Sequence, residues 1–202
     1  MNQSEKRLFL IQSLLNERPS CQKQIIPADS ERQKILLRGL MNVRRPVRIG
    51  ADFLQVQDAY LQDETAAKGI TDIADLTPIQ PGLYLWQGDI TTLKCDAIVN
   101  AANSGMTGCY IPNHRCIDNA IHTFAGVELR LTCEQLMEQQ GYLEPTGQAK
   151  ITPALFPTRG TNNCCAWSSS STAMFCLKKV EAANMIIAEL IAQPITMDRS
   201  VS

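Results

Sequence analysis

Two cysteines and one histidine lie within eight residues of one segment: Cys109, His114 and Cys116. Thiolate and imidazole groups are ligands that zinc prefers, and two thiolates offset the charge of a buried divalent ion. The loop that contains this segment, residues 100–116, also carries glycine and proline, as expected of a loop that wraps an ion. Three protein ligands with a vacant fourth position are typical of catalytic zinc. The spacing therefore predicts a zinc site with an open position.

Two other interpretations of this segment stay open on spacing alone. A fourth ligand from a distant part of the chain would make the zinc structural, and the sequence offers Cys95, Cys133, Cys164 and His122 for that role. The thiols could instead be unliganded residues of the core, because unpaired cysteine is often buried.

Polar side chains follow two predicted strands. Asp89 comes after the apolar residues 83–86, and Asn100 and Asn103 come after the apolar residues 97–99. An aspartate here can accept a hydrogen bond from a ligand amine or hydroxyl, or cap a helix. Carboxamides can both donate to and accept from sugar hydroxyls, or form turns. Asp118 can cap the helix predicted over residues 117–125, whose N-terminal backbone amides suit a phosphate.

The elements that must position these residues fall into two parts. Residues 1–80 are predicted to be helical, with apolar stripes in helices that begin at the caps Ser4 and Ser30 and in a third that ends at Gly69. From residue 81 the pattern becomes strand, loop, helix and strand, which predicts an α/β layer fold with ligands at the carboxyl ends of strands. The further elements expected are a loop at 100–116, helices at 127–140 and 178–191, and a strand at 149–152.

Composition narrows the class of protein. The chain has 202 residues, of which 45% are hydrophobic, so it can bury a core and is not disordered as a whole. Its 19 basic and 20 acidic residues give a net charge of −1, which provides no global field for nucleic acid or an anionic membrane. No apolar run approaches the ~20 residues that span a bilayer, and the N-terminus does not resemble a signal peptide. We expect a cytoplasmic protein with reduced cysteines.

Three motifs together resemble those of macrodomains, which bind ADP-ribose. They are Gly-Asp-Ile-Thr at residues 88–91, Asp-Ala-Ile-Val-Asn-Ala-Ala-Asn at 96–103, and Ile-Asp-Asn-Ala-Ile-His at 117–122 followed by Ala-Gly at 125–126. The loop with Cys109, His114 and Cys116, together with the helical extension, resembles the zinc-dependent macrodomains of bacteria and fungi. That resemblance implies a three-layer α/β/α macrodomain over residues 81–202, with an incomplete sheet, preceded by a helical extension over residues 1–80.

The resemblance also implies an activity and a set of roles. It implies a zinc-dependent glycosidic-bond hydrolase that removes ADP-ribose from modified protein side chains, often encoded beside a sirtuin-type ADP-ribosyltransferase. Its roles by position are adenine contact for Asp89 and Ile90, distal ribose contact for Asn100 and Asn103, zinc binding for Cys109, His114 and Cys116, and catalytic roles for Asn103 and Asp118.

The similarity ends near Thr152. Residues 153–202 are truncated or divergent compared with macrodomains, and no Gly-rich second phosphate loop follows Gly160. Serines at 168–171 stand near that place, but serine lacks the backbone freedom of glycine. Two alternatives to the hydrolase therefore remain: a non-catalytic ADP-ribose-binding module, and an inactive truncated remnant.

Overall fold

The computed structural model describes residues 1–18, 24–81, 83–95, 97–153, 164–168 and 172–176. For the last two segments and Ala97 it describes the backbone only. The helix expected over residues 178–191 lies outside the described residues.

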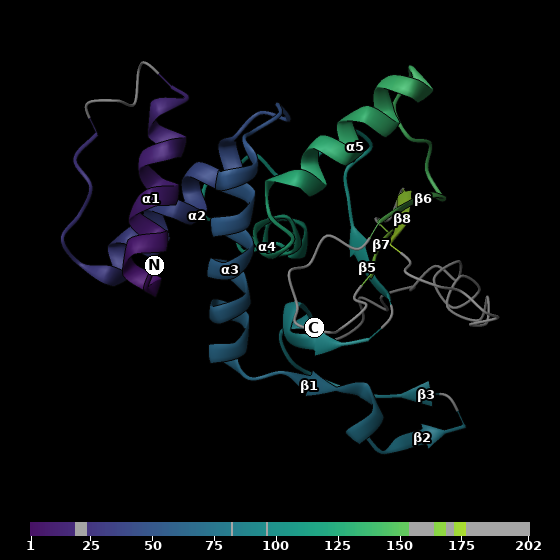
Figure 1. Cartoon of the computed structure of the whole chain (residues 1–202). Coiled ribbons are helices and arrows are strands. Elements are labelled where there is room, and N and C mark those ends of the chain that lie inside the picture. Colours follow the sequence, from purple (N-terminus) through teal and green to yellow (C-terminus); the bar gives the residue numbers. More distant parts are fainter. Residues whose placement is uncertain (19–23, 82, 96, 154–163, 169–171, 177–202) are drawn as a thin grey trace, which may run out of the picture.

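Three helices form the N-terminal region, as the apolar stripes predict. They are α1 (Gln3–Asn16), α2 (Ser30–Val43) and α3 (Ala51–Lys68). Two more follow the first long strand: α4 (Ile117–Phe124) and α5 (Val127–Gln140). In Figure 1 the N-terminal helices gather on one side of the molecule, and α4 and α5 connect them to the strands.

The predicted N-terminal caps are wrong by one or two residues. Asn2, not Ser4, caps α1, and it forms a capping box with Glu5. Asp29, not Ser30, caps α2 by accepting from the backbone of Arg32. The short Asn and Asp side chains reach the first free amides of the helix, so α1 begins at Gln3 and α2 begins at Ser30.

Strands begin at Thr71, so the prediction that residues 1–80 are helical is wrong beyond the end of α3. Two short pairs come first, β1 (Thr71–Asp72) with β4 (Leu93–Lys94) in parallel and β2 (Pro78–Gln80) with β3 (Leu83–Tyr84) antiparallel. Two 3-10 turns, η2 (Ile73–Asp75) and η3 (Ile90–Thr92), lie among them.

A small closed sheet follows, with the strand order β5–β7–β6–β8. Its strands are β5 (Ala97–Ala101), β6 (Gln148–Thr152), β7 (Cys164–Ser168) and β8 (Thr172–Cys176). β5 runs parallel to β7 and β6 runs parallel to β8. Strands β7 and β8 lie in the uncharged stretch between Arg159 and Lys178, which no sequence pattern assigns. The mixed α/β class with a helical N-terminal region is confirmed.

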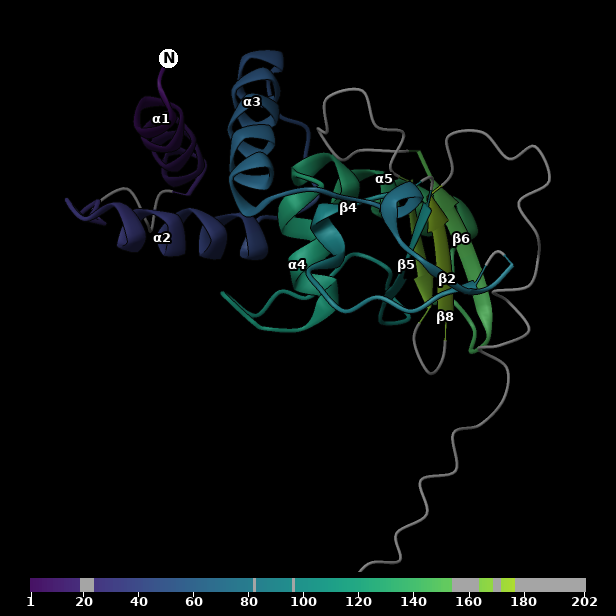
Figure 2. The same ribbon diagram turned by 90° about the horizontal axis from the view of Figure 1, so that it is seen from below.

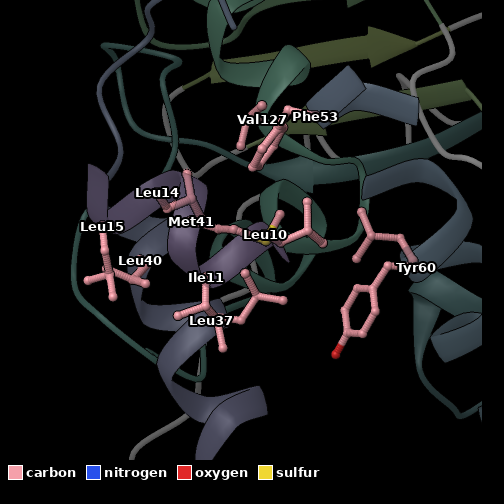
Figure 3. Packing of buried hydrophobic residues seen from close by; sticks show 11 residues of the cluster. Leu10, Ile11, Leu14, Leu15, Leu37, Leu40, Met41, Phe53, Tyr60 and Val127 are labelled. Atoms are coloured by element: carbon pink, nitrogen blue, oxygen red, sulfur yellow. The ribbon is translucent and has the colours of Figure 1, made fainter. Parts of the chain in front are cut away.

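Two hydrophobic clusters hold these layers together. One joins β5, the following loop, α4 and α5 through Ile98, Met106, Ile121 and Leu129. The other joins α1, α2 and α3, and it also includes Val127 at the start of α5. Figure 3 shows Val127 beside Phe53 of α3. In Figure 2, α4 and α5 lie between the N-terminal helices and the sheet, so they contact both parts.

None of the helices in the described ranges is both long and apolar enough to cross a bilayer.

Candidate metal centre and binding residues

The loop between β5 and α4 brings the three predicted metal ligands together. The ligand atoms of Cys109, His114 and Cys116 all lie within 4.8 Å of one another. Cys109 Sγ is 3.5 Å from His114 Nδ1. Cys109 and Cys116 are half-buried free thiols, and His114 is exposed. Residues that are five and two positions apart therefore converge on one point.

The chemistry and spacing of these atoms fit zinc. Tetrahedral zinc with Zn–S near 2.3 Å and Zn–N near 2.0 Å holds its ligand atoms roughly 3.5–3.8 Å apart. Among the described side chains, no fourth Cys, His, Asp or Glu joins the group. Cys133, a predicted alternative ligand, is 0% exposed in the hydrophobic core. The described side chains therefore favour a three-ligand site, whereas the side chain of Cys164, another predicted alternative ligand, lies outside the described residues.

Cys116 has a second role, as the N-cap of α4. Its Sγ accepts from the backbone N–H of Asn119 at 3.4 Å. The prediction that Asp118 caps this helix is therefore wrong, because the chain enters the helix two residues earlier. Burial raises the pKa of the Cys116 thiol, and the neighbouring Cys109 thiol raises it further. A metal that binds there must displace the thiol proton.

Asp118, two residues after the predicted ligand Cys116, forms a buried polar pair with Asn100 of β5. Asn100 Nδ2 donates to Asp118 Oδ1 at 3.2 Å, and His122 Nε2 is 3.6 Å from the same oxygen. Burial raises the pKa of Asp118 to about 7, against the opposing effects of Asn100 and the Arg130 charge. Burial also holds the pKa of His122 well below its usual range, so this imidazole is neutral.

Asn100 keeps an unused acceptor in this pair. Its Oδ1 is buried and accepts no hydrogen bond from the described residues. A buried carboxamide oxygen without a donor is costly, so it is a natural point of contact for a ligand hydroxyl.

Asn103 is exposed, and its side chain shapes the metal loop. Its Nδ2 donates to the carbonyl of Gly108 at 3.2 Å, and its Oδ1 accepts from the backbone of Gly105 at 2.9 Å. The turn-forming interpretation of Asn103 is thus confirmed. Its predicted contact with ribose stays a prediction.

Asp89 and Ile90 lie at the η3 turn. Asp89 Oδ1 accepts from the backbone and hydroxyl of Thr91, and Oδ2 accepts from Lys68 Nζ at 2.8 Å. Burial raises the pKa of Asp89, but the bonds from Lys68 and Thr91 outweigh it and hold the pKa below its usual value. Ile90 packs against the core cluster that contains Ile98. Asp89 therefore caps the turn, and its contact with adenine stays a prediction.

Comparison with known proteins relates this region to one family. Residues 99–184 match the family model of the Macro domain. The match includes the metal ligands, Asn100, Asn103 and Asp118, whereas Asp89 and Ile90 precede it.

Curated relatives extend the similarity into the helical region. A Protein-ADP-ribose hydrolase of Treponema medium is 58% identical over 158 residues, which cover 76% of this chain and 60% of the relative. The Protein-ADP-ribose hydrolase of Staphylococcus aureus (strain MRSA252) is 48% identical over 145 residues, covering 71% and 54%. A probable bifunctional ADP-ribose hydrolase/ADP-ribosyltransferase of Fusarium oxysporum f. sp. cubense is 44% identical over 129 residues, covering 58% and 21%. The chain thus spans 60% of the first relative's length and 54% of the second's.

Sequence reasoning missed three residues that contact the loop with the predicted metal ligands from elsewhere in the chain. Arg38 and Asn42 come from α2, and buried Arg130 comes from α5. The one signal available was Arg130, which stands on the apolar face of its helix between Leu129 and Cys133. An arginine in such a stripe needs buried partners, but the sequence does not say which.

Proposed function

We propose that this chain is a zinc-dependent hydrolase that removes ADP-ribose from modified protein side chains. The observation that carries the proposal is the group of three ligand atoms within 4.8 Å, in a loop of Macro domain sequence. Names of relatives at 48% and 58% identity support the choice of ADP-ribose on protein as the substrate.

In this proposal Cys109, His114 and Cys116 hold the zinc. A bound zinc ion supplies Lewis acidity toward an oxygen and lowers the pKa of water. The reaction is hydrolysis of the bond between C1″ of the distal ribose and the protein side chain. Water adds its oxygen to C1″ and a proton to the departing side-chain atom, so the products are free ADP-ribose and an unmodified protein.

The other residues bind and orient the substrate. Asn100 supports this role with its buried, unused Oδ1, which can accept from a ribose hydroxyl. Asp118 is hydrogen-bonded to Asn100, and Asn103 is hydrogen-bonded to the loop that carries the metal ligands. Both residues are proposed to contact the distal ribose and to act in catalysis. Holding the ribose in one orientation lowers the entropic part of the barrier.

Adenine contact is proposed for Asp89 and Ile90. Asp89 offers carboxylate oxygens at an exposed position beside the half-buried Ile90. The partner that supplies the substrate would be an ADP-ribosyltransferase, of the sirtuin type according to the resemblance. One relative whose name combines hydrolase and transferase supports a functional link between the two activities.

A turnover assay paired with calorimetry tests the proposal. His114→Ala and Cys116→Ala should abolish release of ADP-ribose from a modified protein, because each removes a metal ligand. Binding of ADP-ribose should be kept, because the residues proposed to bind it are unchanged. Arg115→Ala is the matched control, since Arg115 is an exposed residue of the same loop. Elemental analysis should find zinc in the purified chain, and the two ligand variants should lose it.

The outcomes separate the three candidate functions. Full turnover after a chelator has removed the metal contradicts the zinc role. Binding of ADP-ribose without turnover in the wild-type chain indicates a binding module. Absence of binding indicates an inactive remnant.

A further inference from the structure

We propose that α2 of the helical region positions the metal ligands, with Arg38 as the principal positioning residue. This inference rests on the proposed zinc site and assigns residues outside the Macro domain match to its geometry. The ligands lie on a loop without regular structure between β5 and α4. Such a loop needs external contacts to keep three ligand atoms in register.

Arg38 contacts the backbone of one predicted metal ligand and a residue that is hydrogen-bonded to another. Its Nη2 donates to the backbone carbonyl of His114 at 3.1 Å. Its Nε and Nη2 also donate to Asn119 Oδ1 at 3.2 and 2.9 Å. Asn119 is 0% exposed, and its backbone N–H donates to Cys116 Sγ. One guanidinium therefore ties the His114 backbone to the residue that holds Cys116.

The fork fixes the orientation of the Asn119 carboxamide as well. Because Oδ1 faces Arg38, Nδ2 is turned to the carbonyl of Ile111, to which it donates at 3.0 Å. Ile111 also accepts the backbone N–H of His114 at 3.3 Å. Lysine could not reproduce this arrangement, since it lacks the planar pair of donors.

Asn42, one turn after Arg38 on α2, holds the middle of the loop. Its Oδ1 accepts the backbone N–H of Asn113 at 3.0 Å, and its Nδ2 donates to Thr123 Oγ1 of α4 at 3.0 Å. Asn113 has a positive φ of 55°, a conformation that Asn tolerates better than most residues. This contact fixes the residue immediately before His114.

Arg130 holds the start of the loop against the end of α2. It donates to the carbonyls of Thr107 at 2.7 Å and Cys109 at 3.4 Å. On its other side it donates to carbonyls near the end of α2, at Met41, Asn42 and Arg44. Its guanidinium also lies 4.1 Å from the centre of the Tyr110 ring. A positive charge at a helix C-terminus is favourable, and α2 has no basic residue of its own in its last turn.

Metal affinity should therefore depend on α2. A loop that is already ordered loses less conformational freedom when the ion binds, so loosening it weakens binding without changing a ligand. Arg38 is the best residue to test, because it is only half-buried and its removal leaves the hydrophobic clusters intact.

The experiment measures Zn²⁺ affinity of the metal-free 202-residue chain by competition with a chromogenic chelator. Arg38→Ala should bind Zn²⁺ about 10–100-fold more weakly than the wild type, the range typical for residues that support metal ligands. Co²⁺ bound in place of Zn²⁺ should show weaker thiolate-to-metal absorption in the variant, because the ligand geometry is relaxed. Arg38→Lys keeps the charge and the apolar stem, and it should restore only part of the affinity.

The control is Arg32→Ala, which removes the same charge from an exposed position on the same helix. It should bind Zn²⁺ as the wild type does. Circular dichroism checks that each metal-free variant is folded; if Arg38→Ala is not, Arg38→Lys provides the comparison. Unchanged affinity and Co²⁺ spectrum in a folded Arg38 variant overturn the inference. Failure of the wild type to bind either metal refutes the proposed zinc site itself.

Discussion

Gly108, between Thr107 and the first metal ligand, is a position where one added methyl group would disturb the loop. Its φ is +84°, and a Cβ built there would lie 2.5 Å from Cδ2 of His122. His122 is buried on α4 and cannot move away easily. Glycine is required both for the left-handed backbone and for this close approach.

Gly108→Ala should therefore lower the free energy of unfolding by about 2–4 kcal/mol, combining a left-handed alanine with an overpacked contact. Denaturant unfolding measures this loss. The matched control is Gly69→Ala, with a φ of +85° and no atom within 4 Å of the added Cβ, which carries the backbone cost alone. Equal losses in the two variants would show that the His122 contact is unimportant.

At this scale the sequence predicted what is local and missed what is distant. Cys109, His114 and Cys116 are close in sequence, so their convergence follows from a short loop. Arg38 contacts the same loop from a position at least 76 residues away in the sequence, and Arg130 from a position at least 21 residues away. No spacing rule relates them to it, because the contact depends on how α2 packs against α4 and α5.

Among the elements, the contact between α3 and α5 contains both a hydrogen bond that caps α5 and a repulsion between two carboxyl groups. Gln57 Oε1 of α3 accepts the backbone N–H of Val127 at 2.9 Å, at the start of α5. Next to this bond, Asp58 of α3 and Glu128 of α5 bring two carboxyl groups into one interface. Burial raises the pKa of both groups, and the Asp58 charge further raises the pKa of Glu128.

Raised carboxyl pKa values make the folded state less stable as pH increases. Below the unfolded values of 3.8 and 4.5 both groups are protonated in both states and cost nothing. As pH rises through these values, the folded state resists ionisation and loses stability relative to the unfolded state. The loss is complete above the raised pKa values.

Asp58→Asn should thus raise the free energy of unfolding by about 0.5–1 kcal/mol at pH 7, with the gain shrinking as pH is lowered to 4. Thermal unfolding at the two pH values measures it. Glu128→Gln should give a similar gain, and the double variant should gain less than the sum, because the repulsion is shared. A pH-independent effect would argue against repulsion between the two carboxylates.

The long helices were predictable from the sequence, whereas among the short strands β1 to β4 only β3 lies in a predicted strand, at residues 83–86. Helix α5 begins and ends as its apolar stripe and Gly141 indicate. Strands β1 to β4 have only two or three residues each, too few for an alternating pattern to appear. Their pairing depends on tertiary contacts between β1 and β4 and between β2 and β3.

At the scale of the whole molecule, the helical region and the start of α5 share one core. Ile11 of α1 is 0% exposed in the same cluster as Val127. Ile11→Ala should destabilise the chain by about 2–5 kcal/mol. Because the core is shared, the transition followed by tryptophan fluorescence should shift together with that of helical circular dichroism. Both tryptophans, Trp86 and Trp167, lie outside the helical region.

Leu8→Ala is the control for this experiment, since Leu8 is 39% exposed on the same helix. It should shift neither transition substantially. A fluorescence transition that stays in place while the helical signal shifts would mean that the two parts unfold independently.

Lys68 links the last turn of α3 to the proposed adenine contact. Its ammonium donates to Asp89 Oδ2 and lies 3.4 Å from the centre of the Phe124 ring on α4. A purine amine that donates to Asp89 Oδ2 would compete with the ammonium of Lys68, which already donates to that oxygen. A bound purine amine that replaces Lys68 at Asp89 breaks the bond from α3 to η3, and Lys68 then no longer links α3, η3 and α4. If adenine binds at Asp89 as proposed, nucleotide binding is therefore expected to weaken the contacts that Lys68 makes between α3, η3 and α4.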